Sequence, residues 1–313
     1  MTEHAAVAVV LSSAITYTAG ALCFKAALTR GVSVWQVSLW CNVSMMVLYL
    51  PFWTGVNLEA LRASWVLPVV VTVLFFAGQL LTFLALNAGD VSVATPMLGA
   101  KVVLVPVVAA GFFLESIARR WWLAAALSAC AVVVVSRSVP VRSADAPGLP
   151  DSSEVRRRRK LLLTVASSLG AAALFATTDV LFQFWSRAMG VAGFIAAMYT
   201  LLGGLSLAVY LPVFGKRLLS LPSDVSARNA LLAGCLLQAG QNLVMSLVLR
   251  FHGHATTVNV VYSSRCVWSV VLAWATARWV GGTENRLPTR LLWMRLGGAG
   301  LLLAAICLVV LPS

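Results

Sequence analysis

Ten long apolar runs, each about the length of a membrane-spanning helix, take up most of this 313-residue chain. A helix needs about 20 apolar residues to cross the hydrocarbon core of a bilayer. Only 11% of the residues are charged, whereas soluble domains have about a quarter, so the composition excludes a large soluble domain. The predicted spans are residues 5–28, 34–54, 65–87, 91–114, 120–137, 161–185, 191–214, 229–250, 255–280 and 290–311.

A polar segment separates the fifth run from the sixth. Residues 138–160 contain three prolines, several serines and the basic cluster Arg156–Lys160, which exclude this segment from the hydrocarbon core. The sequence therefore predicts a first five-helix repeat over residues 1–137, a polar basic linker over 138–160 and a second five-helix repeat over 161–313.

The two halves show the same order of features. Phe76–Gln79 in the third run corresponds to Gln238–Gln241 in the eighth, and Thr29–Gly31 after the first run corresponds to Ala188–Gly190 after the sixth. Because five is an odd number of spans, the second half enters the membrane from the opposite face. We therefore predict an all-α membrane protein with ten transmembrane helices as two inverted five-helix repeats, an architecture that builds a substrate site near the midplane. Chance similarity among helices rich in Ala and Leu is the alternative.

The clearest motifs lie between the third and fifth runs. Leu84–Gly89 is followed by Ser92–Pro96, then by Phe112–Glu115 and a short last helix over Trp121–Ser136. In these motifs, and over nearly its whole length, the chain resembles the EamA-like members of the drug/metabolite transporter superfamily. The resemblance implies ten helices around a central cavity that carries small solutes. The second half has no clear acidic counterpart of Glu115, so a symmetric role for that residue is not expected.

Two cations lie at matching places inside the fourth and ninth runs. Lys101 is near the middle of residues 91–114, and Arg265 is near the middle of residues 255–277. A charge at the bilayer centre costs roughly 2.5–3.5 kcal/mol on insertion scales, so both residues are candidates for a functional role. They would bind a negatively charged substrate group, with Arg265 offering two parallel hydrogen bonds. Sugar-phosphate translocators of the same superfamily are similar in holding phosphate with basic residues on these two spans.

The alternative for both cations is a packing role, in which they bind helix-end carbonyl groups or a buried acid. If the cations are uncompensated, replacing Lys101 or Arg265 by Ala is expected to abolish anion transport without harming the fold.

Four further polar residues complete the predicted substrate site. Gln79 and Gln241 occupy matching positions in the third and eighth runs, and Tyr262 lies about one turn before the cation of the ninth run. Asp179 is the only acid well inside an apolar run, and it would either neutralise one of the two cations in the empty state or carry a proton. The alternative for Asp179 is a partly exposed position near a helix end. Each amide or hydroxyl also has an alternative role, because polar side chains often join helices in membranes.

Several functional classes are excluded by what the sequence lacks. The net charge of +13 comes from basic residues between apolar runs, so no nucleic-acid partner is expected. The six cysteines lack the paired spacing of a zinc site, and His252 with His254 supplies too few metal ligands. The sequence has no nucleophile elbow and no Gly-rich phosphate loop. We expect no enzyme activity, no cofactor and no metal.

Together these features predict a secondary transporter that moves a small organic solute, an anionic or zwitterionic metabolite, by alternating access. Its expected partners are that substrate and the lipid bilayer of the cell membrane. One alternative is a translocase of phosphate-bearing lipid carriers, and another is a non-transporting membrane assembly subunit. A homodimer is compatible with each of these.

The orientation of the chain is predicted differently by two arguments. Most Lys and Arg residues outside the spans, Arg295 counted among them, lie in the odd-numbered connections. By the positive-inside rule this places both termini outside the cytoplasm. The family resemblance implies that both termini lie inside.

Overall fold

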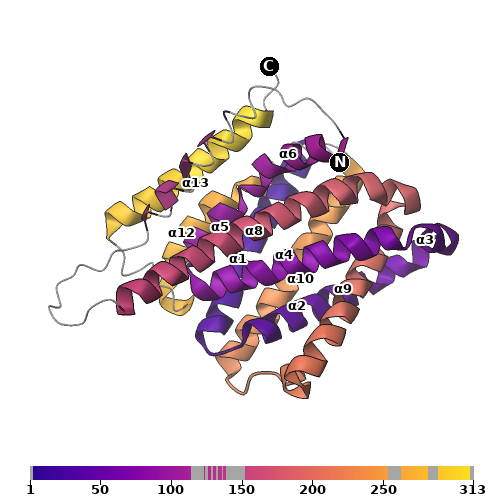
Figure 1. Cartoon of the computed structure of the whole chain (residues 1–313), viewed down its shortest axis with the longest axis horizontal. Helices are drawn as coiled ribbons and strands as arrows, with labels where there is room; N and C mark the ends of the chain where they lie inside the picture. The colour runs from indigo at the N-terminus through magenta and orange to yellow at the C-terminus, as the bar shows by residue number, and fades with distance from the viewer. Residues whose placement is uncertain are drawn as a thin grey trace.

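The computed structural model describes residues 3–113, 152–252, 262–280 and 288–310, together with scattered residues between 123 and 138. Within these ranges the chain folds into a bundle of helices without any β-strand (Figure 1). The predicted fifth span, residues 120–137, lies mostly outside the described residues, and so do Glu115 and His254.

The first half begins with two long helices joined by a tight turn. α1 (Glu3–Thr29) leads through Gly31, which has a positive φ of 89°, into α2 (Val34–Tyr49). Glycine is favoured in such a turn because it has no Cβ to clash. Ser33 caps α2 by accepting a hydrogen bond from the backbone N–H of Gln36. The half continues with η1 (Leu50–Gly55), α3 (Leu58–Ser64), α4 (Val66–Ala88), α5 (Val91–Leu98) and α6 (Lys101–Phe113).

The second half also begins with two long helices joined at a glycine. α8 (Ser152–Met189) turns at Gly190, which has a positive φ of 77°, into α9 (Val191–Phe214). α8 starts inside the segment predicted as a linker, so the basic cluster Arg156–Lys160 is helical. The remaining elements are η2 (Lys216–Leu219), α10 (Val225–His252), α12 (Arg265–Val280) and α13 (Thr289–Val310).

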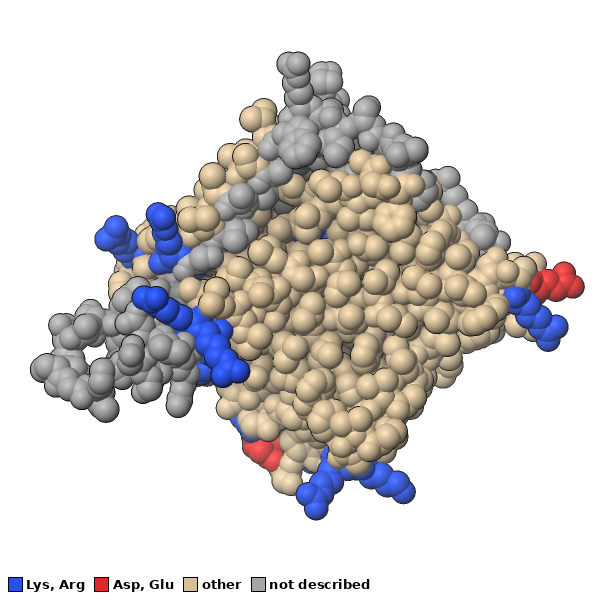
Figure 2. Space-filling model, in the orientation of Figure 1, with Lys and Arg blue, Asp and Glu red and all other residues tan. Residues whose placement is uncertain are grey.

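Seven helices in the described part of the chain are long and apolar enough to cross a membrane. Figure 2 shows a broad face without charge and Lys and Arg side chains at its edges. Large apolar side chains such as Val213, Leu236 and Trp274 are exposed on the helices. Since such a surface is stable against lipid rather than water, the chain is an integral membrane protein. The seven candidate spans are Ala8–Thr29, Val34–Gly55 (α2 with η1), Val66–Ala88, Val91–Phe112 (α5 with most of α6), Arg158–Ser186, Val191–Phe214 and Val225–Val248.

Helices from the two halves of the chain pack against each other. α1 packs along α10, α4 packs along α8 and α2 packs along α9. α5 crosses α12, and α13 packs against α12 at the edge of the bundle (Figure 1). The buried side chains of Phe24, Met45, Phe83 and Leu231 belong to one hydrophobic core that joins helices of both halves. The halves are therefore interleaved and do not form two separate domains.

Candidate substrate site

Each of the two predicted cations begins a helix. Gly99 and Ala100 form a turn between α5 and α6, and α6 begins at Lys101. A turn at Ser264 directly precedes α12, which begins at Arg265. The negative end of the α5 dipole at Leu98 adjoins the positive start of α6, so the charge at this point comes from the Lys101 side chain rather than from the helix ends.

The two interrupted helices touch near these starts. Gly99 lies so close to Cys266 that a Cβ at position 99 would collide with the sulfur atom. Cys266 Sγ also lies 3.9 Å from the carbonyl oxygen of Pro96. Because Gly99 lies just before Lys101 and Cys266 directly follows Arg265, this contact brings both cations to one region of the bundle.

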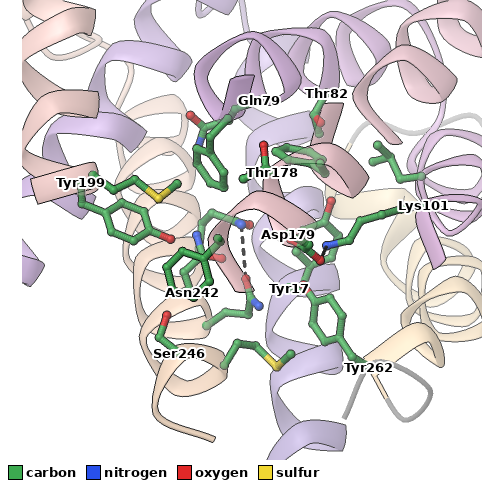
Figure 3. A pocket seen from close by; sticks show the side chains of 18 of the residues that line it. Tyr17, Gln79, Thr82, Lys101, Thr178, Asp179, Tyr199, Asn242, Ser246 and Tyr262 are labelled. Carbon is green, nitrogen blue, oxygen red and sulfur yellow. Dashed lines mark hydrogen bonds and ion pairs between the residues drawn. The ribbon is translucent and has the colours of Figure 1, made fainter. Parts of the chain in front are cut away.

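A cavity of about 430 Å³ lies beside the two helix starts. Its wall comes from α1, α4, α5, α6, α8, α9, α10 and the chain around the start of α12 (Figure 3). Its volume is within the range of small-molecule sites. All six residues predicted for the substrate site line this cavity: Gln79, Lys101, Asp179, Gln241, Tyr262 and Arg265.

Lys101 pairs with an acid on another helix. Its Nζ lies 2.6 Å from Oδ2 of Asp179 on α8 (Figure 3). The Lys101 side chain is 14% exposed and the Asp179 side chain is 38% exposed, so the pair is open to the cavity. Asp179 thus pairs with one of the two predicted cations and is also partly exposed, so its role in the site stays a prediction. No described acid pairs with Arg265.

Arg265 lies against two aromatic rings. Its Cζ is 4.6 Å from the ring centroid of Tyr17 and 4.6 Å from that of Tyr262. The residue is 7% exposed, and its Nε has no hydrogen-bond partner in the described structure. A neutral ring attracts a cation by about 0.5–2 kcal/mol but does not cancel its charge. Arg265 is therefore a buried and well-positioned cation that keeps N–H groups for a further partner.

The amide side chains of the wall have only weak partners. Gln79 Nε2 and Asn242 Nδ2 donate to sulfur atoms of α2 over 3.4 and 3.6 Å. The Oε1 atom of Gln79 is buried and has no hydrogen-bond partner in the described structure. Gln241 Oε1 accepts a hydrogen bond of 3.3 Å from Gln238 Nε2. Because sulfur is a poor acceptor, these amides retain hydrogen-bonding capacity toward the cavity.

Aromatic side chains form much of the remaining wall. Phe75 and Phe175 both line the cavity, with their ring centroids 5.4 Å apart. Phe24, Phe83 and Leu86 line it toward the C-terminal ends of α1 and α4, and each is at most 2% exposed. These three residues are here called the floor. The cavity therefore combines a charged region with apolar surfaces.

The sequence prediction missed several hydroxyl groups of the wall. Thr82, Thr178 and Ser246 line the cavity (Figure 3). Hydroxyl side chains are common in membrane helices, where they bond to backbone carbonyls, so their presence alone does not indicate a site. The neighbouring position of Thr178 and Asp179 is the one local signal that the sequence offered.

Two other cations inside apolar helices have packing partners. Lys25 Nζ donates to carbonyl oxygens at the end of α4 over 2.8 and 2.6 Å. Arg295 is fully buried in α13, where it pairs with Asp90 at 3.1 Å and donates to Ser92. The assignment of Arg295 to a connection is therefore wrong, because its charge is stabilised inside the bundle by an acid from the other half. Neither Lys25 nor Arg295 lines the cavity.

The cavity offers no metal site among its described residues. Asp179 is its one carboxylate, and no His or Cys lines it. No group of three or more His, Cys, Asp or Glu side chains that would hold a metal occurs in the described part of the chain.

Comparisons with known proteins give a fold but no family. No protein-family model matches the sequence, and no curated protein matches it. A solved crystal structure of a protein superposes on the chain with a TM-score of 0.63. The superposition covers 98% of this chain and 97% of that chain at 13% sequence identity. At this identity the similarity concerns the fold alone, and it extends over nearly the whole of both chains.

Proposed function

We propose that the protein is a secondary transporter similar to the EamA-like drug/metabolite transporters, with ten transmembrane helices as two inverted five-helix repeats. It moves a small anionic or zwitterionic organic solute across the cell membrane by alternating access. The observation that carries this proposal is Arg265, a buried cation beside a cavity with no acidic partner among the described residues. A buried charge is costly unless it is paired, and a substrate anion is the natural counter-charge.

The helix packing supports two related halves. In an inverted repeat, α1, α2 and α4 of the first half correspond to α8, α9 and α10 of the second. The contact of α1 with α10 then has its counterpart in the contact of α8 with α4, and the contact of α2 with α9 is its own counterpart. All three contacts are extensive. The turns at Gly31 and Gly190 share a positive φ, and Lys101 and Arg265 each begin a helix. Interrupted helices commonly build the substrate sites of inverted-repeat transporters.

The shape of the cavity supports alternating access. Asp179 is 38% exposed, whereas the floor of Phe24, Phe83 and Leu86 is buried. Access from one side with closure on the other is what a transporter needs in each of its two end states. In the other end state, the floor residues separate and the opposite end closes.

The two alternative functions have less support. A translocase of lipid carriers predicts an apolar groove that leads to Lys101. A second groove on α1, α10 and α12 is apolar, but it reaches Arg30 and includes neither cation of the cavity. A non-transporting assembly subunit predicts a filled interior at Lys101 and Arg265, where the cavity lies instead.

A ligand screen followed by a flux measurement tests the proposal. Purified protein in detergent is heated with organic anions, amino acids and nucleotides, because a ligand at 100 times its Kd stabilises the folded state by about 2.7 kcal/mol. Uptake of each hit is then measured in liposomes. We expect at least one organic anion to stabilise the protein and to be transported, and Arg265→Met to lose both effects. Uptake that Arg265→Met leaves unchanged, or a screen without any stabilising anion, contradicts the proposal.

A further inference from the structure

Three charged side chains line the cavity in the described part of the chain: Lys101, Asp179 and Arg265. Lys101 and Asp179 form an ion pair of 2.6 Å, so their charges cancel locally. Arg265 lies against the rings of Tyr17 and Tyr262, which are neutral. The described residues of the cavity wall therefore carry one net positive charge, and that charge lies at Arg265.

The rest of the described wall does not change this balance. Gln79, Gln238, Gln241 and Asn242 contribute neutral amides, and the remaining uncharged polar side chains of the wall are hydroxyls. The negative end of the α5 dipole at Leu98 adjoins the positive start of α6, so the helix ends add no clear net charge there. A ligand with one negative charge is therefore what brings the cavity to neutrality.

We infer that the cavity selects ligands with a single net negative charge and an apolar or aromatic body, an inference that rests on the proposed transport function. A carboxylate accepts hydrogen bonds from the guanidinium of Arg265, whose Nε is buried and unpartnered. The body of the ligand lies against the phenyl rings of Phe75 and Phe175. Asp179 is then a specificity-determining residue, because it occupies Lys101 and withholds a second cation from the ligand.

Ligands of other charge meet an electrostatic cost. A dianion either leaves one negative charge uncompensated or displaces Asp179 from Lys101. A zwitterion brings its own cation near Arg265, and a neutral molecule leaves Arg265 unpaired. Unit charges a few ångströms apart in a partly buried site change a binding constant by more than about tenfold.

A set of probes on one ring tests the charge preference. Benzoate carries one negative charge, isophthalate carries two, 3-(aminomethyl)benzoate is a zwitterion and benzylammonium is a cation. Their dissociation constants are measured on the full chain in detergent by thermal shift and by calorimetric titration. Butyrate and succinate repeat the comparison on an aliphatic body. We expect each monoanion to bind at least about tenfold more tightly than the matching dianion, and the zwitterion and the cation to bind more weakly than benzoate.

Three variants shift the cavity charge in defined steps. Asp179→Asn raises the net charge to two, so the preference should change from benzoate to isophthalate. Lys101→Met lowers it to zero, so the zwitterion should gain relative to benzoate. The double variant Lys101→Met with Asp179→Asn returns the net charge to one and should return the preference for benzoate. An effect of lost packing alone would not reverse in the double variant.

The failure of this inference differs from the failure of the proposed function. If the unaltered protein binds dianions as tightly as monoanions, the charge rule is wrong and the anion transporter stands. If no probe anion binds on either scaffold, the proposed anion site itself is contradicted. An unchanged preference in Asp179→Asn overturns the rule. If Asp179→Asn does not fold, the double variant Lys101→Met with Asp179→Asn takes its place. A double variant that does not prefer benzoate then also overturns the charge rule.

Discussion

Arg295 on α13 and Asp90 before α5 form an ion pair in which Arg295 Nη2 lies 3.1 Å from Asp90 Oδ2 and the guanidinium is fully buried. The two residues are 205 positions apart in the chain, so the pair joins α13 to the first half of the bundle. The ion pair of Lys101 and Asp179 differs, because its acid is 38% exposed and faces the cavity. The two pairs should therefore respond differently to the loss of their acids.

Asp90→Ala is expected to destabilise the protein more than Asp179→Ala. Removal of Asp90 takes the ion-pair partner from a fully buried cation and should cost about 3 kcal/mol. Removal of Asp179 affects a partly exposed pair and should cost about 1 kcal/mol or less. Thermal unfolding of both variants in the same detergent, without ligand, measures the difference. A lower midpoint for Asp179→Ala than for Asp90→Ala would contradict the division into a structural pair and a cavity pair.

Lys101→Met is expected to lower both anion selectivity and stability. The sequence predicted that loss of Lys101 would not harm the fold if no acid compensated the charge of Lys101. Asp179 compensates it at 2.6 Å, so the variant leaves a carboxylate without its partner. We expect a loss of about 1 kcal/mol, limited by the exposure of Asp179 to water, and recovery on adding Asp179→Asn. Unfolding midpoints of the single and double variants check this, and equal midpoints would show that the pair does not contribute.

Arg265→Lys is expected to fold normally and to bind a monoanion about tenfold more weakly. A lysine cannot form the second charge-assisted hydrogen bond, and it cannot stack on the rings as a planar guanidinium does. Titration with benzoate measures the loss. Tyr17→Phe is the matched control, since it keeps the ring beside the guanidinium at 4.6 Å. Arg265→Lys binding as tightly as the unaltered protein would exclude the two-bond contact.

Two adjacent glycines of α9 should respond in opposite ways to substitution. A Cβ at Gly203 would lie 2.6 Å from Met46 Cβ on α2, whereas nothing lies within 4 Å of a Cβ at Gly204. Gly203→Ala should therefore push α9 from α2 and destabilise the protein by about 1–3 kcal/mol. Gly204→Ala should be neutral or stabilise by up to about 1 kcal/mol, because alanine favours a helix. Unfolding midpoints of the two variants test this, and equal effects would contradict the close α2–α9 contact.

The sequence alone determined the positions of most of the long apolar helices. The predicted run at residues 191–214 has the same bounds as α9, and the run at 65–87 differs by one residue at each end from α4. These bounds are readable because the thickness of the bilayer sets the length of each helix locally. The six predicted site residues also all line the cavity, because a polar or charged side chain in a membrane helix is excluded from lipid and turns inward.

The tertiary structure decided which partner each charged group has. Lys101 and Arg265 look alike in the sequence, yet Asp179 neutralises Lys101 and the rings of two tyrosines surround Arg265. Arg295 looked like a residue of a connection, and Asp90 holds it inside the bundle. Partners of this kind depend on how each helix is rotated and on which helix lies beside it, as at the contact of Gly99 with Cys266. Rotation and neighbourhood follow from packing over the whole bundle, whereas hydrophobic length is a property of each segment alone.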